Sequence, residues 1–178
     1  GRQESEKLPF TEQRLAGECA HAAGIIRRQP GMNKLIIKHN ELTAEEFILL
    51  WEAVHWGPGP SLEQTRLAME HTLFRVSVFD EDQIVAMARV IGDMGLDYYI
   101  KDVIVRPEYQ KKGIGRLLIN EILQYINDHG VEGTDIFVEL CAMPDKIPFY
   151  GKFGFSANEA QRLRLFHRVE KQNDSGGA

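Results

Sequence analysis

The sequence predicts one domain of the α/β (α+β) class, built on a mixed, mostly antiparallel central sheet. Three observations lead to this prediction. The chain has 178 residues and is 43% hydrophobic, which suits a single domain with a substantial core. Runs with the period of a strand alternate with runs of helical period. Near the middle, a strand, a glycine-bearing loop, a helix and another strand follow one another, and such a crossover requires parallel strands.

Three parts of the chain differ in composition. Residues 1–31 show no sustained period, and Met32 directly precedes the first strand-like run. We therefore expect residues 1–31 to be an N-terminal extension or an artificial leader, and residues 32–171 to form the domain. Residues 172–178 are polar and rich in glycine, so we expect a frayed C-terminal tail.

One strand and two helices open the domain. The strand is predicted over residues 34–38, and the first helix over residues 43–51. Thr43 is followed three residues later by a glutamate, which is the pattern of a capping box. Residues 56–60 contain two glycines and two prolines and break the helix. A second helix with another capping-box pattern is predicted over residues 61–71.

The remaining elements are predicted from the same signals of period and punctuation. They are strands over residues 74–79, 84–91, 98–105, 136–140 and 163–169, and a helix from Ile114 to about Gly130. The first two of these strands flank a short polar loop and should form a hairpin. Pro107 cannot donate to a strand ladder and ends the third.

Composition excludes several classes of protein. With 21 Lys and Arg against 26 Asp and Glu, the net charge of −5 offers no footprint for nucleic acid or an anionic membrane. Cys19 and Cys141 are too few for a disulfide framework or a zinc site, and no metal is expected. No apolar run approaches the roughly 20 residues that span a bilayer. We expect a soluble, cytoplasmic protein.

The most informative stretch is residues 103–118, in which a strand leads through a basic, glycine-punctuated loop into a helix. Backbone N–H groups at a helix N-terminus attract anions, and the helix dipole adds about half a positive charge. Gly113 and Gly115 allow the backbone to approach a phosphate closely. Lys111, Lys112 and Arg116 add positive charge that suits a diphosphate.

A simpler interpretation is an ordinary loop with solvated lysines. The spacing also differs from the P-loop, which needs Gly-Lys-Ser/Thr, and from the GxGxxG pattern of dinucleotide sites. Binding of nucleoside triphosphates or NAD is therefore not indicated.

The spacing Gln110-x-x-Gly113-x-Gly115 after an apolar strand and Arg-Pro-Glu-Tyr resembles the acetyl-CoA signature of the GNAT N-acetyltransferases. The resemblance in element order covers about residues 34–169. It implies helices on both faces of the sheet, and a parallel strand pair that splays apart at the acetyl-CoA site. In that family the loop amides bind the CoA pyrophosphate, and strand residues such as Val103 and Val105 pair with the pantetheine arm. The implied cofactor-binding residues are Val103, Ile104, Val105, Gln110, Lys111, Lys112, Gly113, Ile114, Gly115, Arg116, Lys146 and Tyr150.

A second stretch, residues 142–155, resembles the family's short helix with the pattern Phe-Tyr-x-Lys-x-Gly-Phe. The resemblance implies that Tyr150 is the catalytic acid that protonates the leaving CoA thiolate. The alternative for Tyr150 is packing between helix and sheet. Many members bind the cofactor through an asparagine early in this helix. Here the stretch reads Met-Pro-Asp-Lys, and Lys146 is the candidate replacement.

The acceptor side is less constrained. A primary amine must lose a proton before it attacks a thioester, and the candidate bases are Asp97, Asp102 and Glu139. Strand alternation places Asp102 on the face opposite Val103 and Val105. The substrate pocket is expected near the two-helix region and the hairpin ends. Its candidate residues are Trp56, Asp93 and Tyr99, with Trp51, His55 and Tyr98 as further aromatic or polar neighbours.

The sequence therefore predicts an acetyl-CoA-dependent N-acetyltransferase that moves an acetyl group directly to a small-molecule primary amine in a ternary complex. Two alternatives stay open: a non-catalytic acyl-CoA-binding regulatory module, and an acetyltransferase that acts on a protein or peptide. The expected partners are acetyl-CoA and the amine, with neither nucleic acid nor membrane, and a homodimer is an open alternative to a monomer.

Overall fold

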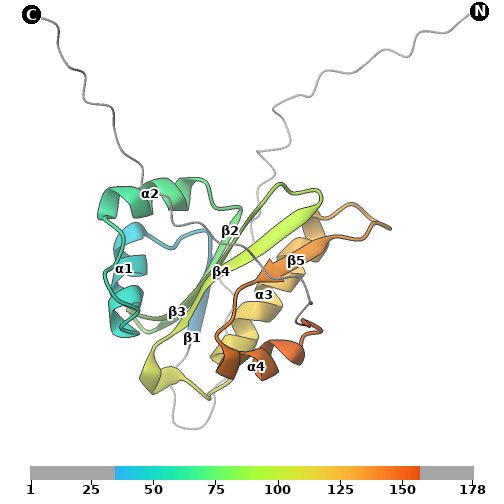
Figure 1. Ribbon diagram of the computed structural model, residues 1–178. Coiled ribbons are helices and arrows are strands. Elements are labelled where there is room, and N and C mark those ends of the chain that lie inside the picture. The colour runs from blue at the N-terminus through green and yellow to red at the C-terminus, as the bar shows by residue number, and fades with distance from the viewer. Residues whose placement is uncertain (1–34, 157–178) are drawn as a thin grey trace, which may run out of the picture. The chain divides into compact units, whose positions relative to one another are not determined.

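The structure is a computed structural model that describes residues 35–156 (Figure 1). The leader at residues 1–31, the strand at residues 163–169 and the tail at residues 172–178 lie outside the described residues. The chain divides into two units, Gly1–Cys141 and Ala142–Ala178. Among the described helices, none is long and apolar enough to cross a membrane.

The first unit contains a five-stranded sheet in the order β1-β2-β3-β4-β5. Its strands are β1 Leu35–His39, β2 Phe74–Asp80, β3 Gln83–Gly92, β4 Asp97–Val105 and β5 Phe137–Leu140. Neighbours from β1 to β4 pair antiparallel, and β4 and β5 pair parallel. The predicted mixed sheet with one parallel pair is thus confirmed.

Tight turns set the register of the antiparallel strands. Only two residues separate β2 from β3, and the first, Glu81, has a φ of +56°. Between β3 and β4, the Oδ1 atom of Asp93 accepts the backbone N–H groups of Gly95, Leu96 and Asp97 at 2.9, 2.8 and 3.0 Å. A Cβ atom at Gly92 would lie 2.1 Å from the Asp97 carbonyl oxygen, so this close approach requires glycine.

Helices α1 Ala44–Ala53 and α2 Leu62–Glu70 both begin with a complete capping box. They follow β1 along the chain and pack over one face of the sheet, as Figure 1 shows. The core on this face joins side chains of α1 and α2 to side chains of three strands. It consists of Leu42, Phe47, Leu50, Met69, Phe79, Ile84, Met87 and Ile104. We call this the α1 face.

Helix α3 Ile114–His129 covers the opposite face and contacts β2, β3 and β4. Its buried residues Ile114, Leu118, Ile122 and Ile126 recur every four positions and form one apolar stripe. Helices therefore lie on both faces of the sheet, as the resemblance implied. We call this second side the α3 face.

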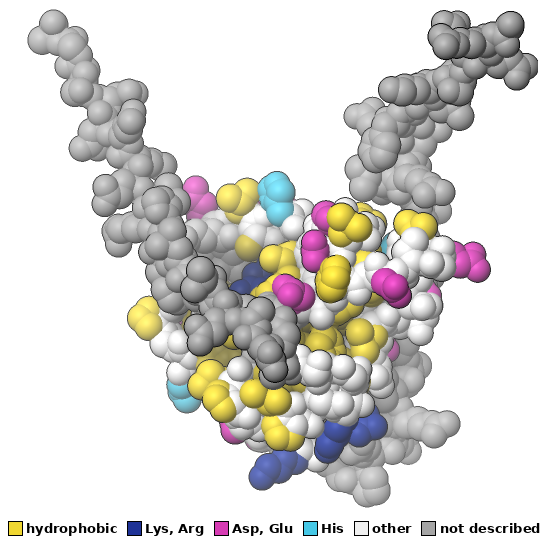
Figure 2. All heavy atoms as spheres, turned by 45° about the vertical axis from the view of Figure 1, so that its right-hand side comes forward, with side chains coloured by type: hydrophobic (Ala, Val, Ile, Leu, Met, Phe, Trp, Pro, Cys, Tyr) yellow, Lys and Arg dark blue, Asp and Glu magenta, His cyan; other side chains and the backbone are white. Residues whose placement is uncertain are grey.

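β5 is the least buried strand of this sheet. Its residue Phe137 is 72% exposed, whereas each of the other strands contributes buried side chains. Leu96 and Val131 are also exposed, and Figure 2 shows apolar side chains interspersed with acidic ones on the side of the molecule that carries β5.

The second unit is short. It contains the 3₁₀-helix η3 Pro144–Lys146 and helix α4 Ile147–Gly151. Three ring contacts hold its aromatic side chains together: Phe149 lies edge-on to Tyr150 and to Phe153, and Tyr150 lies edge-on to Phe155. The short helix predicted in residues 142–155 is therefore present.

Candidate active site

The N-terminal end of α3 is open to an anionic ligand. Gly113 is the N-cap residue, with φ +82° and ψ −4°. The first intrahelical bond runs from the Leu117 N–H to the Gly113 oxygen at 3.1 Å, so the N–H groups of residues 114–116 have no acceptor within the helix. Among the described residues, no side chain caps this end, in contrast to the boxes that close α1 and α2. The positive pole of α3 is left for a ligand.

The loop before α3 combines left-handed backbone with positive charge. Lys111 has a φ of +60° and Gly113 a φ of +82°, and such turns direct successive N–H groups toward a common anion. Within the part of the chain that the structure describes, Lys111, Lys112 and Arg116 form no ion pair. Their charges are available to a diphosphate. We call residues 110–116 the anion cradle.

The cradle is anchored to the strands by residues to which sequence analysis assigned no role. The Tyr109 hydroxyl donates to Asp80 Oδ2 at 2.8 Å, and Arg106 Nε donates to the Ile84 oxygen at 2.8 Å, both at the β2–β3 hairpin. The hydrogen bond to Asp80 raises the pKa of Tyr109 above its ordinary value. Arg106 and Tyr109 belong to the Arg-Pro-Glu-Tyr stretch, which was the one signal that pointed to them.

Gln110 also holds the loop in place. Its Nε2 atom donates to the Val105 oxygen at 3.0 Å, so its side chain ties the start of the cradle to the end of β4. Lys112 lies with Nζ 5.1 Å from the centre of the Tyr109 ring, in a cation–π arrangement. Side-chain contacts of Gln110 and Lys112 therefore hold the first residues of the cradle in place.

Part of β4 presents a free edge next to the cradle. The pairing of β4 with β5 ends at Ile100 and Leu140, whereas β4 continues to Val105. Over residues 101–105, no described strand pairs with β4 on its β5 side. The two parallel strands therefore cease to pair before the end of β4, and an extended ligand arm could bind as an added strand along residues 101–105.

A β-bulge interrupts β4 in this segment. Lys101 pairs with Arg89 and Ile104 pairs with Met87, so that Asp102 and Val103 together stand opposite a single residue of β3. Asp102 has a φ of +51°. In a regular strand, residues four positions apart lie on the same face. Here Ile100 pairs with Val90 and faces α3, but the extra residue places Ile104 in the core of the α1 face.

The Asp102 side chain lies on the α1 face, where Oδ2 accepts a hydrogen bond from Arg89 Nε. The two side chains are 11% and 13% exposed, so this is a largely buried ion pair. Val103 and Val105 alternate with Ile104 and lie on the other side, which agrees with the predicted placement of Asp102.

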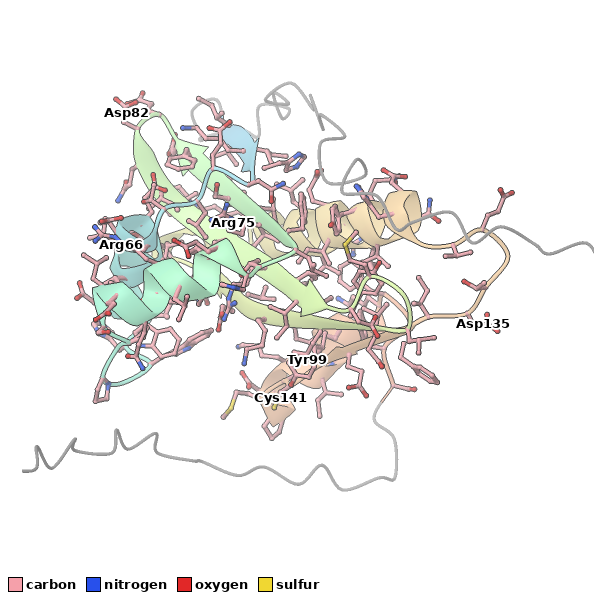
Figure 3. The ribbon with its side chains drawn as sticks, turned by 90° about the horizontal axis from the view of Figure 1, so that it is seen from above. Arg66, Arg75, Asp82, Tyr99, Asp135 and Cys141 are labelled. Atoms are coloured by element: carbon pink, nitrogen blue, oxygen red, sulfur yellow. The ribbon has the colours of Figure 1, made fainter. Side chains whose placement is uncertain are left out.

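The other two candidate bases differ in their surroundings. Asp97 begins β4, and its N–H donates to Asp93. Glu139 is half-buried in β5 and stands beside Tyr99 in the parallel register. Tyr99 lies on the α1 face: Figure 3 shows its side chain on the side of the sheet away from α3, and Lys101 Nζ lies 5.6 Å from the ring centre. The fold therefore brings Glu139 and Tyr99 together.

The substrate candidates divide between structural and exposed positions. Asp93 serves the β3–β4 turn, and the N–H groups of Asp97, Gly95 and Leu96 lower the pKa of its carboxyl group. Tyr98 is 1% exposed and belongs to the core on the α3 face. Burial raises the pKa of its hydroxyl. The Tyr98 side chain is therefore not open to a substrate, whereas Asp93 is exposed and engages the turn through Oδ1.

The aromatic residues at the end of α1 form a small cluster. Trp51 Nε1 donates to the Gly57 oxygen at 3.3 Å and thereby holds the α1–α2 loop. Trp56 lies edge-on to Trp51 with ring centres 5.3 Å apart, and it is 49% exposed. His55, at the bend before it, has a φ of +54°. Trp56 is thus an exposed aromatic surface on the α1–α2 loop.

In the second unit, Tyr150 packs against Phe149 and Phe155 with ring centres 5.0 and 6.2 Å away. Burial raises the pKa of the Tyr150 hydroxyl. The Nζ atom of Lys146 lies 2.6 Å from Asp145 Oδ2 in an exposed ion pair.

Comparison with known proteins gives the family. The chain matches the model of the acetyltransferase (GNAT) family over residues 39–155, which include β4, the cradle, α3 and α4. The chain belongs to the GNAT family of acetyltransferases. Membership implies acetyl-CoA as the cosubstrate and an acetyl-transfer reaction.

Two curated relatives illustrate the range of this GNAT protein's similarities. It is 30% identical over 118 residues to serotonin N-acetyltransferase 2, chloroplastic, of Oryza sativa subsp. japonica, covering 62% of this chain and 56% of that protein. It is 27% identical over 110 residues to an N-acetyltransferase named ycf52 of Porphyra purpurea, covering 60% of each. The chain thus spans about 60% of the length of such relatives.

A solved structure shares the fold. A GNAT family acetyltransferase from Streptococcus pneumoniae matches with a TM-score of 0.63 and 26% identity, and the match covers 76% of this chain and 99% of that one.

The residues of this GNAT protein fit the cofactor. A diphosphate matches the uncapped end of α3 with its left-handed Gly113, and the pantetheine arm matches the unpaired edge of β4. Bound acetyl-CoA would supply an activated acetyl group as a thioester. The residues that would hold it are the cradle and the β4 edge. Among the described residues, no group of His, Cys, Asp or Glu is placed to bind a metal.

Proposed function

We propose that this protein transfers an acetyl group from acetyl-CoA to the primary amine of a small molecule, directly and within a ternary complex. The observation that carries the proposal is the uncapped N-terminus of α3 beside the unpaired edge of β4. The two features match two adjoining parts of one ligand, a diphosphate and the extended arm that carries the thioester. An ordinary surface loop would need neither.

The cradle binds the CoA pyrophosphate through the amides of residues 113–116, and Lys111, Lys112 and Arg116 neutralise its charge. Val103, Ile104 and Val105 hold the pantetheine arm through their backbone. A backbone N–H at this edge polarises the thioester carbonyl, since a fixed donor aimed at developing negative charge commonly contributes a few kcal/mol. Positioning accounts for much of the remaining acceleration.

The reaction itself needs one base and one acid. The neutral amine nitrogen attacks the thioester carbonyl carbon, the new C–N bond forms and the C–S bond breaks. We propose that Glu139 accepts the proton of the amine, because it stands on β5 beside Tyr99, whose ring lies on the α1 face. Tyr150 donates a proton to the departing thiolate, because a phenol is protonated at neutral pH and the thiolate can accept its proton.

The acceptor is proposed to carry an aromatic or apolar group next to its amine. Trp56 and Tyr99 offer aromatic surface on the α1–α2 loop and on the α1 face. The rice relative is named a serotonin N-acetyltransferase, which favours arylalkylamines as the class of acceptor.

The cytoplasmic location stays a prediction, since that relative is named as chloroplastic.

The proposal is tested by mixing the full chain with acetyl-CoA and a panel of arylalkylamines, polyamines, amino sugars, amino acids and peptides, while free thiol is measured. Release of thiol that depends on one class of small amine is expected, and the acetylated product is identified by mass spectrometry. Turnover with peptides alone would assign the protein-modifying alternative. Tight binding of acetyl-CoA without turnover would assign the binding module.

Two variants test the roles of acid and base. Tyr150→Phe should lower kcat by roughly 10²- to 10⁴-fold and leave the acetyl-CoA affinity unchanged. Glu139→Gln should lower kcat/KM by a similar factor, with partial recovery at high pH, where more of the free amine is neutral. Wild-type rates in either variant would remove that residue from the mechanism.

A further inference from the structure

The β-bulge in β4 contains a backbone conformation that its residue does not favour. Asp102 has a φ of +51°, in the left-handed region that glycine adopts at no steric cost. Aspartate and asparagine visit this region more readily than other residues with a side chain, but single positions there still need support from their surroundings. Within a central strand, such support must come from tertiary contacts.

The contact that supplies this support is the ion pair with Arg89. Arg89 Nε donates to Asp102 Oδ2, and the two side chains are 13% and 11% exposed. Arg89 is itself held from two further elements. Its Nη1 atom donates to Thr72 Oγ1 at 3.1 Å, and its guanidinium lies 5.9 Å from the centre of the Phe47 ring. A buried charge without its partner is strongly unfavourable, so the pair restricts the Asp102 side chain to one position.

The bulge decides how the following residues are presented. In a strand, successive N–H and C=O groups point to alternate edges, and successive side chains point to alternate faces. One extra residue at Asp102 and Val103 reverses both for the rest of β4. Residues 103–105, which we assign to the thioester arm, lie directly after this reversal. The bulge therefore selects which of their backbone groups face the unpaired edge.

We propose that the Arg89–Asp102 ion pair is a positioning device for acetyl-CoA: it holds the bulge, and the bulge aims the β4 backbone at the thioester. This inference rests on the proposed function. Arg89 and Asp102 are positioning residues that act through the backbone of residues 103–105. The competing interpretation is that Asp102 itself takes the proton of the amine.

The central test uses two double variants that differ by one methyl group. Arg89→Met combined with Asp102→Gly removes both charges and leaves a residue that adopts the left-handed conformation freely. Arg89→Met combined with Asp102→Ala removes the same charges but disfavours that conformation. We expect the Gly variant to keep kcat/KM within about threefold of wild type and the Ala variant to lose about 10- to 100-fold. Equal values in the two variants would overturn the proposal.

Asp102→Asn separates positioning from proton transfer. Asparagine tolerates the left-handed region and still accepts a hydrogen bond from Arg89, but it cannot take a proton. We expect kcat/KM within about threefold of wild type and an unchanged pH profile. If Asp102→Asn loses 100-fold or more in kcat/KM, and the Arg89→Met, Asp102→Gly variant does not recover it, Asp102 is the base and the positioning role is wrong.

Two controls address general effects on stability. Arg66→Met breaks the exposed ion pair with Glu45 and should change neither rate nor affinity. Arg89→Met combined with Met94→Gly places a glycine at a different left-handed position, φ +63°. This variant should not reach the kcat/KM of the Arg89→Met, Asp102→Gly variant. Circular dichroism establishes the temperature at which all variants are folded, and rates are measured below it.

Acetyl-CoA affinity, measured by calorimetry, separates failure of this inference from failure of the proposed function. If wild-type protein turns over no amine, the transferase proposal fails. The Gly variant should nevertheless still bind acetyl-CoA more tightly than the Ala variant. If the two bind equally, or if the wild type does not bind acetyl-CoA, the positioning proposal fails as well.

Discussion

At the scale of single residues, the cradle depends on backbone conformations that most side chains disfavour. Gly113 has a φ of +82° and caps α3 without a side chain of its own. Lys111 adopts φ +60° two residues earlier. A side chain at Gly113 would strain the turn and would stand close to the amides that receive the phosphate. Glycine is therefore needed there both for conformation and for access.

Gly113→Ala should weaken acetyl-CoA binding. The left-handed conformation costs alanine about 1–2 kcal/mol; if the free loop relaxes and must regain this conformation to bind, the cost corresponds to a roughly 5- to 30-fold higher Kd. Calorimetry with CoA measures this Kd. Gly133→Ala is the matched control, because Gly133 also has a positive φ, +76°, with nothing near its Cβ position. It should lose stability without losing affinity. Equal Kd values for Gly113→Ala and wild type would contradict this role of Gly113.

Tyr109→Phe should loosen the cradle and show a defined pH dependence. The hydrogen bond to Asp80 raises the pKa of Tyr109 in the folded protein. A raised folded pKa means that the contribution to stability is complete below the ordinary value of 10.0 and is lost as pH rises through the folded pKa. The variant should be less stable by up to about 1 kcal/mol at neutral pH. Urea unfolding at neutral pH and at increasing pH above 10.0 should show the difference becoming smaller as pH rises. A constant difference over this range would refute the assignment.

At the scale of the elements, the three long helices are started in two ways. α1 and α2 satisfy their first amides with side chains of their own, Thr43 with Glu46 and Ser61 with Gln64. α3 leaves its first amides open and begins with glycine. Capping stabilises a helix within the chain, whereas an uncapped, positively polarised end stabilises a bound anion. The difference separates structural helices from the helix whose N-terminus we propose to bind the cofactor.

Removing a cap should therefore affect stability and spare function. Thr43→Ala is expected to lower the free energy of unfolding by about 1 kcal/mol, because one helix amide loses its acceptor. Denaturant unfolding gives the value, and acetyl-CoA affinity should stay at the wild-type level. A loss of affinity would show that the start of α1 is coupled to the cofactor site.

At the scale of the whole first unit, the sheet separates two layers of core. Phe47, Leu50 and Met69 fill the α1 face, and the stripe along α3 fills the other. α3 thus serves twice: its side chains close one layer and its N-terminus forms the cradle. The position of the cofactor site is therefore as stable as the core beneath α3.

Leu118→Ala tests how much α3 contributes to the core. Leu118 is 0% exposed, and its truncation should lower the free energy of unfolding by about 2–5 kcal/mol. Leu67→Ala is the matched control, since Leu67 on α2 is 59% exposed and should change stability by less than about 0.5 kcal/mol. Thermal and denaturant unfolding give both values. A small effect at Leu118 would mean that α3 is not a principal part of the core.

The sequence by itself determined the features that depend on neighbouring residues. The capping boxes, the tight hairpin turn, the span of α3 and the glycine spacing of the cradle were predicted within a residue or two. Each depends on local periodicity, on a cap or on a backbone preference, and all of these act over a few positions. The glycine-bearing loop before α3 could be predicted because it is made of contiguous residues, and its role as an anion site stays a prediction.

The tertiary structure alone decided which distant residues meet. The bulge at Asp102 and Val103 puts the two parts of β4 out of phase in their side-chain alternation, and it depends on the register with β3. The partners Arg89 for Asp102, Asp80 for Tyr109 and Tyr99 for Glu139 likewise lie on different strands or loops. Tyr98 and Tyr99 are adjacent aromatic residues in the sequence, yet one is buried under α3 and the other faces the α1 side. Strand pairing makes these choices, because one step in register exchanges the two faces of a sheet.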